Sequence, residues 1–215
     1  MAARTPLSRE RVLAAAVASA DRDGLDAVSM RNLAAELGVV PMAIYKHVAS
    51  KDELLDGMVD VVVAEIAPPG RGGWKAVLRA RILSAREAML RHPWAPAVLE
   101  SRTTPSPVVL AHMDSTIAIL LDGGLSTDLA HHAMHALGSR TFGFSQELYP
   151  TPPGTSMPPE VAAQLAQWFP HVVAVATSRP HDPSSVVGPG CDDQFEFEFG
   201  LDLLLDGIER RHKQH

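Results

Sequence analysis

Cysteine and long hydrophobic runs are almost absent from this chain. Of its 215 residues only Cys191 is a cysteine, which excludes an intrachain disulfide and any metal site built from several cysteines. No apolar run approaches the roughly 18 residues that cross a bilayer, and the N-terminus carries Arg4 without the apolar core of a signal peptide. The sequence therefore predicts a cytoplasmic protein with no membrane partner.

Aromatic residues and strand-like patterns are also scarce. Aromatic residues make up 5% of the chain, against 46% hydrophobic and 20% charged residues, so aliphatic side chains and alanine must fill most of a globular core. Residues 195–199 alternate Phe and Glu, as a strand would. However, Phe195, Phe199 and Leu203 are spaced at i, i+4 and i+8, which favours a helix. We expect an all-α fold.

A net positive charge is missing as well. The formal charge is −6, whereas proteins that bind DNA need positive surface. Residues 1–50 contain six Lys and Arg against five Asp and Glu, and the remaining 165 residues contain 13 against 20. The acidic excess therefore lies outside the first fifty residues, and charge alone does not indicate a nucleic-acid partner.

The informative pattern of the chain lies between residues 23 and 55. Ser29 precedes an apolar-periodic run that includes Leu33, and Gly38 follows at the point where helices commonly end in a left-handed residue. Pro41 then suits the first turn of a second, short helix, where its missing N–H costs nothing. Helix, glycine turn and short helix together predict a helix-turn-helix, whose second helix enters the major groove of DNA.

A third helix follows the motif and leads to a domain border. Ser50 and Glu53 form a capping box, which starts a connecting helix over residues 51–66. The proline- and glycine-rich stretch 68–73 cannot continue that helix, so we place the border near Ala67. The predicted domains are residues 1–66, a three-helix DNA-binding domain that includes the connecting helix, and residues 67–215, a helical domain.

The order of these features resembles the N-terminal DNA-binding domain of TetR-type transcriptional repressors. The matching strings are GLD at 24–26, SMRNLA at 29–34, LGV at 37–39, IYKHV at 44–48 and KDELL at 51–55. The resemblance implies that the second helix of the motif lies in the major groove. It implies a DNA-binding surface that consists of Ser29, Arg31, Pro41, Met42, Ala43, Tyr45, Lys46, His47 and Lys51.

The residue types on that surface suggest how DNA is read. Tyr45 and His47 suit phosphate contacts, which set register rather than sequence, and Arg31 suits a contact with guanine. The recognition helix has no Asn or Gln, so we expect specificity to rest on Arg31, Lys46 and DNA shape. Tyr45 could instead pack between helices, and Lys46 and His47 could be ordinary solvated residues.

Beyond Ala67 the apolar periodicity predicts further helices separated by two proline-rich loops. The helices span about 74–92, 93–99, 107–121, 127–144, 160–176 with a bend at Pro170, and 192–211; the loops are 149–159 and 178–190. The segments RHPW at 91–94 and FEFGLDLLLDGIE at 197–209 resemble the ligand-binding and dimerisation domain of the same family. The resemblance implies a homodimer formed by helices 127–144 and 195–208.

The same resemblance places a small-molecule pocket among the middle helices of the second domain. Candidate lining residues combine apolar walls with a few polar groups, although each could simply pack the core. They are Trp94, Arg102, His112, Thr116, His135, Ser139 and Phe142.

The histidines allow an alternative that belongs to another class of protein. His131 and His135 are four residues apart on one helical face, and His112 lies on the preceding helix. Paired imidazoles at this spacing can bind zinc, but catalytic zinc usually needs a third protein ligand, and no HExxH motif is present. We expect no metal and no cofactor, and the alternative is a small helical metal-dependent hydrolase that uses His112, His131 and His135.

The helix-turn-helix motif decides between these possibilities. We expect a transcriptional regulator rather than an enzyme, a repressor released from a palindromic double-stranded DNA operator by a small-molecule effector. Activation instead of repression stays open. A DNA-binding protein without an effector is a further alternative, against which the length of chain after residue 66 argues.

Overall fold

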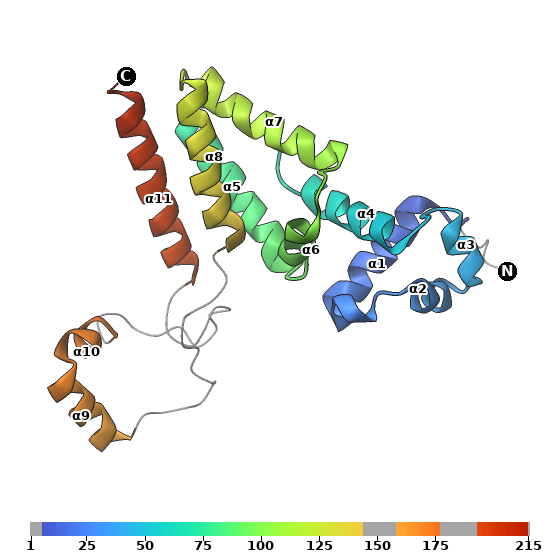
Figure 1. Ribbon diagram of the computed structural model, residues 1–215, viewed down its shortest axis with the longest axis horizontal. Helices are drawn as coiled ribbons and strands as arrows, with labels where there is room; N and C mark the ends of the chain where they lie inside the picture. The colour runs from blue at the N-terminus through green and yellow to red at the C-terminus, as the bar shows by residue number, and fades with distance from the viewer. Residues whose placement is uncertain (1–5, 144–157, 177–192, 215) are drawn as a thin grey trace. The chain divides into compact units, whose positions relative to one another are not determined.

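The computed structural model describes residues 6–143, 158–176 and 193–214, and every regular element in these ranges is helical (Figure 1). The all-α prediction is confirmed. The helices are α1 (Arg9–Asp23), α2 (Met30–Leu37), α3 (Pro41–Tyr45), α4 (Lys51–Ala64), α5 (Trp74–Arg91), α6 (Ala95–Ser101), α7 (Pro107–Asp122), α8 (Thr127–Gly143), α9 (Pro159–Trp168), α10 (Pro170–Ala176) and α11 (Asp193–His212), with a 3-10 turn at Leu25–Ala27. Cys191, loop 178–190 and most of loop 149–159 lie outside the described residues.

Serine caps start the helices where the sequence predicts them. At each start a serine hydroxyl accepts a backbone N–H from the residue three positions on, which satisfies one of the orphan donors of the first turn. The pairs are Ser8 with Arg11 at 3.3 Å, Ser29 with Asn32 at 3.1 Å, Ser50 with Glu53 at 3.0 Å, Ser106 with Val109 at 3.2 Å and Ser126 with Leu129 at 3.2 Å.

Some helix boundaries differ from the predicted ones. The connecting helix α4 ends at Ala64, two residues before the predicted end, and Glu65 caps it. The short helix expected from Pro93 begins at Ala95. The helix expected over residues 160–176 is split into α9 and α10 at Phe169, which confirms the expected effect of Pro170, since that residue has no N–H to continue the ladder.

Backbone contacts divide the chain into two compact units, residues 1–134 and 135–215. Within the first unit, α1 contacts α2 and α4, α2 contacts α3, and α4 also contacts α5, α6 and α7. Helix α4 therefore packs on helices from both sides of Ala67, so compactness does not separate residues 1–66 from the helices that follow. The border at Ala67 stays a prediction about the division of function.

The core around the helix-turn-helix is aliphatic, as the scarcity of aromatics requires. Its fully or almost fully buried side chains come from α1, α2, α3, α4, the end of the 3-10 turn and the loop between α3 and α4: Val12, Ala16, Val28, Leu33, Ile44, Val48, Leu54 and Met58. Burial of a Val, Leu, Ile or Met side chain contributes about 1.5–3 kcal/mol. Within this core α3 contacts α2, and α1 contacts both α2 and α4.

Candidate nucleic-acid interface and buried polar sites

The turn between α2 and α3 has the geometry that the sequence predicts. Gly38 adopts φ 65° and ψ 37°, the left-handed region that glycine enters without steric cost. The N–H of Val39 donates to the carbonyl of Ala34 at 2.9 Å, which closes the end of α2. Pro41 then takes the first position of α3. Each backbone choice follows from a residue type that suits it.

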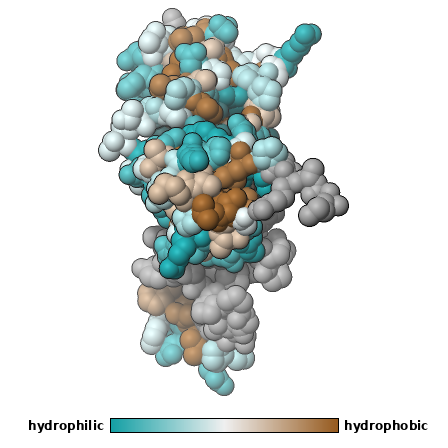
Figure 2. Space-filling view, turned by 90° about the vertical axis from the view of Figure 1, so that its right-hand side faces the viewer, coloured by the Kyte–Doolittle hydropathy of each residue, from teal (hydrophilic) through white to brown (hydrophobic). Residues whose placement is uncertain are grey.

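Helix α3 buries one side and exposes the other. Ile44 is fully buried, whereas Met42 is 69% exposed and Tyr45 is 46% exposed. Pro41, Lys46 and Arg31 are also exposed, and Ser29, Ala43 and His47 are half-buried. The exposed side of α3 therefore gathers apolar, aromatic and basic side chains at one surface. In Figure 2 the side that carries α2 and α3 faces the viewer, and polar surface surrounds small apolar patches there.

Lys51 has a partner inside the first unit. Its ammonium donates to the carbonyl of Val28, so it links the start of α4 to the segment before α2. Nearby, the carboxylate of Glu53 accepts the N–H of Ala49 at 2.7 Å, whereas the usual capping box returns to the N–H of the cap residue. These contacts hold the loop between α3 and α4.

A buried guanidinium that the sequence analysis did not single out lies between α5 and α7. Arg81 is 6% exposed. Its Nε donates to Oγ1 of Thr116 at 2.9 Å, and its Nη2 lies 3.0 Å from Nδ1 of His112 and 2.6 Å from Oγ of Ser115. The structure thus brings together two predicted pocket residues, His112 and Thr116. The residue that joins them, Arg81, was not predicted to belong to the pocket.

Burial and the charge of Arg81 shift the pKa values in this cluster. Burial, and then the positive charge of Arg81, lower the pKa of His112 from 6.5 to about 4. The imidazole is therefore neutral at pH 7 and can accept a hydrogen bond from the guanidinium. Burial also lowers the pKa of Arg81 itself.

Trp94 belongs to a different polar cluster at the ends of α4 and α5. Its Nε1 donates to Oδ1 of Asp21 at 2.7 Å. Nδ1 of the buried His92 lies 2.8 Å from the same oxygen, and Nε2 of His92 lies 3.2 Å from Oε1 of Glu65. Arg91 donates to Oε2 of Glu65 at 2.7 Å. The predicted pocket residue Trp94 thus faces α1, and its partners in RHPW contact two carboxylates.

The pKa of Glu65 reflects its contacts with Arg91 and His92. Partial burial acts to raise its pKa, but hydrogen bonds from Arg91 and His92 outweigh burial and hold the pKa of Glu65 below its usual value. The carboxylate is therefore ionised at neutral pH.

Arg102 joins α6 to α4. Its Nη1 lies 3.2 Å from Oδ1 of Asp52 and 3.3 Å from Oδ1 of Asp56. These two carboxylates lie on the first two turns of α4, so the predicted pocket residue Arg102 forms a polar bridge between helices. Its place in a pocket is not evident from these contacts.

The remaining predicted pocket residues lie in the second unit. His135 and Ser139 are exposed and Phe142 is half-buried. In the same unit, Arg140 of α8 donates to the carbonyl of Glu196 and lies 5.1 Å from the ring centre of Phe197 on α11. Arginine over an aromatic ring is a favourable contact, so it fixes the C-terminal part of α8 against α11.

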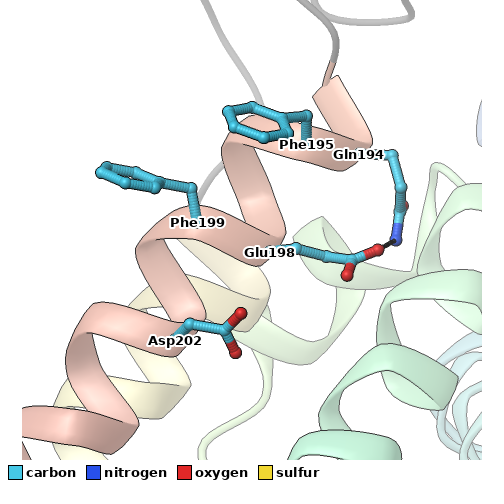
Figure 3. Close-up of a pocket in the computed structure, with 5 residues that line it drawn as sticks. All are labelled: Gln194, Phe195, Glu198, Phe199 and Asp202. Atoms are coloured by element: carbon cyan, nitrogen blue, oxygen red, sulfur yellow. Dashed lines mark hydrogen bonds between the residues drawn. The ribbon is translucent and has the colours of Figure 1, made fainter.

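The exposed side of α11 carries a shallow hollow of about 410 Å³. Figure 3 shows Phe195 and Phe199 projecting on one side of the helix and Glu198 reaching toward Gln194 on another. The two rings are stacked with centres 6.2 Å apart. Sequence analysis assigned this helix to dimerisation and did not predict a hollow on it.

The histidines do not assemble into a metal site in the described part of the chain. Within residues 6–143, 158–176 and 193–214, no three His, Cys, Asp or Glu side chains are placed to hold a metal ion. His112 faces Arg81, and the ring of His131 lies edge-on to that of His132 at 5.4 Å. The hydrolase alternative therefore has no support. Among the same residues, no helix is long and apolar enough to cross a membrane.

Comparison with known proteins agrees with this architecture. Residues 12–58 match the family model for bacterial regulatory proteins of the tetR family, and residues 67–212 match the tetracycline repressor-like C-terminal domain. The HTH-type transcriptional repressor DrrR1 of Streptomyces coeruleorubidus is 32% identical over 212 residues, which cover 94% of this chain and 77% of that protein. The tetracycline repressor protein class G of Vibrio anguillarum is 27% identical, over 96% of this chain and 95% of that one.

Solved structures give the same result. The Streptomyces coelicolor TetR family protein ActR in complex with actinorhodin superposes with a TM-score of 0.70 and 27% identity, over 97% of this chain and 99% of that chain. Two family models together span both halves of the sequence, and the curated relatives match over almost its whole length. The chain therefore belongs to the TetR family of ligand-responsive bacterial transcriptional repressors, which bind DNA through an N-terminal helix-turn-helix.

Proposed function

We propose that this protein acts as a cytoplasmic homodimer that binds a palindromic operator through α3 and leaves it when a small-molecule effector binds. The observation that carries the proposal is the α2–turn–α3 unit, with Ile44 fully buried and Met42 and Tyr45 exposed on the opposite side. No catalytic role is assigned to any residue. The functional border lies at Ala67, and the second domain holds the effector.

The DNA-contacting surface consists of the side chains exposed around α3. Arg31 projects from α2 and is exposed, so it can reach a base edge, where arginine pairs with guanine in a bidentate manner. Tyr45 and Lys46 can reach phosphates, which position the helix on the duplex. We assign DNA contact to Ser29, Arg31, Pro41, Met42, Ala43, Tyr45, Lys46, His47 and Lys51.

The homodimer is supported by apolar surface on both sides of α11. Phe197, Leu201 and Leu205 are fully buried, whereas Phe199 and Leu203 are 53% and 59% exposed. Large apolar side chains on two sides of a helix are normally both covered, and a second copy of α11 would cover the exposed side. A two-fold axis would also present two copies of α3 to two half-sites of a palindrome.

Release by an effector requires that the effector bind one spacing of the two DNA-binding heads more tightly than the other. Helix α4 is suited to transmit this difference, because it contacts α1 on one side and α5, α6 and α7 on the other. ActR has been solved with actinorhodin, which supports a small organic effector for this chain. Such a molecule could contact the guanidinium of Arg81, and His112 and Thr116 both lie within hydrogen-bond distance of that group.

Operator binding is the first test. Duplexes selected from a random-sequence pool by the parent protein are labelled, and their affinity is measured by fluorescence anisotropy over a salt series. We expect salt-sensitive binding that Arg31→Ala and Tyr45→Ala each weaken by about tenfold, since a specific contact contributes about 1–3 kcal/mol. Arg71→Ala in the exposed segment after α4 is the matched control and should bind like the parent.

Selection of no palindromic sequence, or equal affinity of the Arg31 and Tyr45 variants and the parent, would contradict the assigned surface. Sedimentation of Leu203→Glu separates the dimer from DNA contact, because it buries a charge in the proposed interface while leaving α3 unchanged. A dimer of unchanged stability in that variant would contradict the α11 interface.

A further inference from the structure

Arg81 is a buried cation that meets no carboxylate among the residues that the structure describes. It is 6% exposed, and all the acceptors that it contacts among the described residues are neutral: the hydroxyls of Thr116 and Ser115, Nδ1 and the carbonyl of His112, and the carbonyl of Ala67. Buried charges in proteins are normally paired, because transfer of an ion out of water is costly. By contrast, Arg91 and Arg102, which also join helices, face the carboxylates of Glu65 and Asp52.

The pKa shifts of Arg81 and His112 are those expected where a buried cation has no carboxylate beside it. The pKa of Arg81 is lowered by burial, and no nearby acid raises it. His112 cannot supply negative charge, and burial together with Arg81 lowers its pKa to about 4. The cluster therefore keeps a net positive charge at neutral pH.

The guanidinium of Arg81 also has an N–H group with no acceptor among the described residues. Nη1 carries two N–H groups, and in the described part of the chain it contacts a single acceptor, the carbonyl of Ala67 at 3.0 Å. The hydroxyls of Ser115 and Thr116 each accept from Arg81 and donate their single proton to the carbonyl of His112, at 3.0 Å and 2.8 Å. An acidic oxygen that approaches Nη1 would thus find a donor, while the other partners keep the guanidinium in place.

We propose that the effector of this protein is a small molecule with an anionic oxygen, a carboxylate or a phenolate, and that Arg81 is the residue that pairs with it. This inference rests on the proposed function and names the chemical class of its effector. A charge-assisted hydrogen bond to arginine is stronger than a neutral one, and here it would supply the counter-ion that the cluster lacks.

The site is placed to act on the connecting helix. Ala67 follows the C-terminal end of α4, and its N–H donates to Oγ of Ser84 at 2.9 Å while its carbonyl accepts from Arg81. An anion that binds the second N–H of Nη1 would lie beside that carbonyl and repel it. The effector would then act on the segment that follows α4, and α4 is the helix that contacts α1.

Matched pairs of aromatic acids and their amides test the charge requirement. The full-length parent protein is titrated with benzoate, salicylate, 2-naphthoate and anthraquinone-2-carboxylate and with the corresponding amides, and binding is followed by thermal shift and by tryptophan fluorescence. We expect the acids to bind about tenfold or more tightly than their amides, as hydrogen bonds to charged groups imply. In Arg81→Gln the acid and the amide should bind equally.

Three further variants keep the test decisive. Arg71→Gln removes an arginine from the exposed segment after α4 and should retain the preference for acids, which excludes an effect of net charge. Arg81→Lys keeps the charge without the planar fork and should retain part of the preference. Ser115→Ala keeps the guanidinium and frees an N–H of Nη2, so its preference should equal or exceed that of the parent, even if Arg81→Gln fails to fold.

Operator anisotropy on the same preparations separates this inference from the proposed function. Acids that bind the parent should lower its operator affinity, whereas the amides should not. If the parent binds its operator but no acid is preferred over its amide, the anionic class is wrong and the regulator assignment stands. A preference for acids that persists in Arg81→Gln would place the anion elsewhere and overturn the role of Arg81.

Discussion

Nδ1 of His92 lies 2.8 Å from Oδ1 of Asp21, although 71 residues separate the two in the chain. The other ring nitrogen faces Oε1 of Glu65 at 3.2 Å. One buried imidazole therefore lies between a carboxylate of α1 and the residue that caps α4. Because Trp94 also donates to Asp21, the segment after α5 is tied to the first helix of the DNA-binding head.

Replacement of His92 should weaken this junction. In His92→Phe the ring volume is kept, but Asp21 loses one donor and Glu65 faces a nonpolar edge. We expect the free energy of unfolding to fall by about 1–3 kcal/mol, the cost of leaving polar groups unsatisfied. Urea unfolding at pH 7 measures it. His171→Phe on exposed α10 is the control, and equal stability of the two variants would show that the junction contributes nothing.

The titration of His112 predicts a pH dependence of stability. Its pKa is about 4 in the folded protein and 6.5 when unperturbed, so the unfolded chain binds more protons between these values. Stability must then fall as the pH is lowered from about 6.5 toward 4. In His112→Asn, whose amide oxygen can still accept from Arg81, the loss between pH 7 and pH 5 should shrink by about 1 kcal/mol.

Urea unfolding at both pH values checks the His112 prediction. The relevant quantity is the difference between the two pH values in each protein, since Glu65 also has a lowered pKa and loses stabilisation at lower pH. His171→Asn should retain the full dependence of the parent. An unchanged difference in His112→Asn would contradict a neutral His112.

Close packing of α1 against α4 makes Gly57 sensitive to substitution. A Cβ at this position would lie 2.6 Å from Cδ2 and 3.0 Å from Cδ1 of Leu13. Overpacking costs about 1–3 kcal/mol, and the helix propensity of alanine offsets about 1 kcal/mol. Gly57→Ala should therefore lose about 1 kcal/mol net.

Gly70→Ala is the control for that substitution, because nothing lies within 4 Å of a Cβ there. Its midpoint in urea should match that of the parent. If Gly57→Ala unfolds at a higher denaturant concentration than the parent, α1 and α4 are not in close contact at Leu13.

Two lysines near the DNA-contacting surface should behave differently. Lys46 is exposed, whereas the ammonium of Lys51 donates to the carbonyl of Val28. Loss of one phosphate contact lowers the slope of log affinity against log salt by about 1. Lys46→Gln should reduce the slope without loss of stability, and Lys51→Gln should also lower the free energy of unfolding by about 0.5–1.5 kcal/mol.

Anisotropy over a salt series and urea unfolding of the same samples distinguish these outcomes. A slope that Lys46→Gln leaves unchanged would remove Lys46 from the phosphate contacts. Loss of stability in Lys46→Gln but not in Lys51→Gln would reverse the two roles.

Local structure could be predicted from the sequence wherever a single residue type is enough to start or end a helix. Ser29 predicts the start of α2, Gly38 its left-handed end and Pro41 the start of α3, because capping, positive φ and a missing N–H are properties of single residues. The split at Pro170 follows for the same reason. The boundaries of α4 and α6 were less predictable, since helix ends depend on the packing of Glu65 and Trp94 as well.

The proposed DNA-contacting surface is local in the same sense. Its residues lie within about twenty positions of one another, and the helical period alone sorts Ile44 inward and Tyr45 outward. The proposed effector site is different. His112 and Thr116 could be singled out from the sequence, but Arg81 contacts Thr116 from another helix and donates to the carbonyl of Ala67 as well.

Periodicity and residues close together in the chain were enough to specify the all-α class, most helix starts and the helix-turn-helix. The polar partnerships depend on the packing of the helices: Trp94 pairs with Asp21, Arg102 with Asp52 and Asp56, and Arg81, among the described residues, with neutral groups. Those contacts join residues far apart in the chain, and nothing in local spacing specifies which distant side chain each charge will meet.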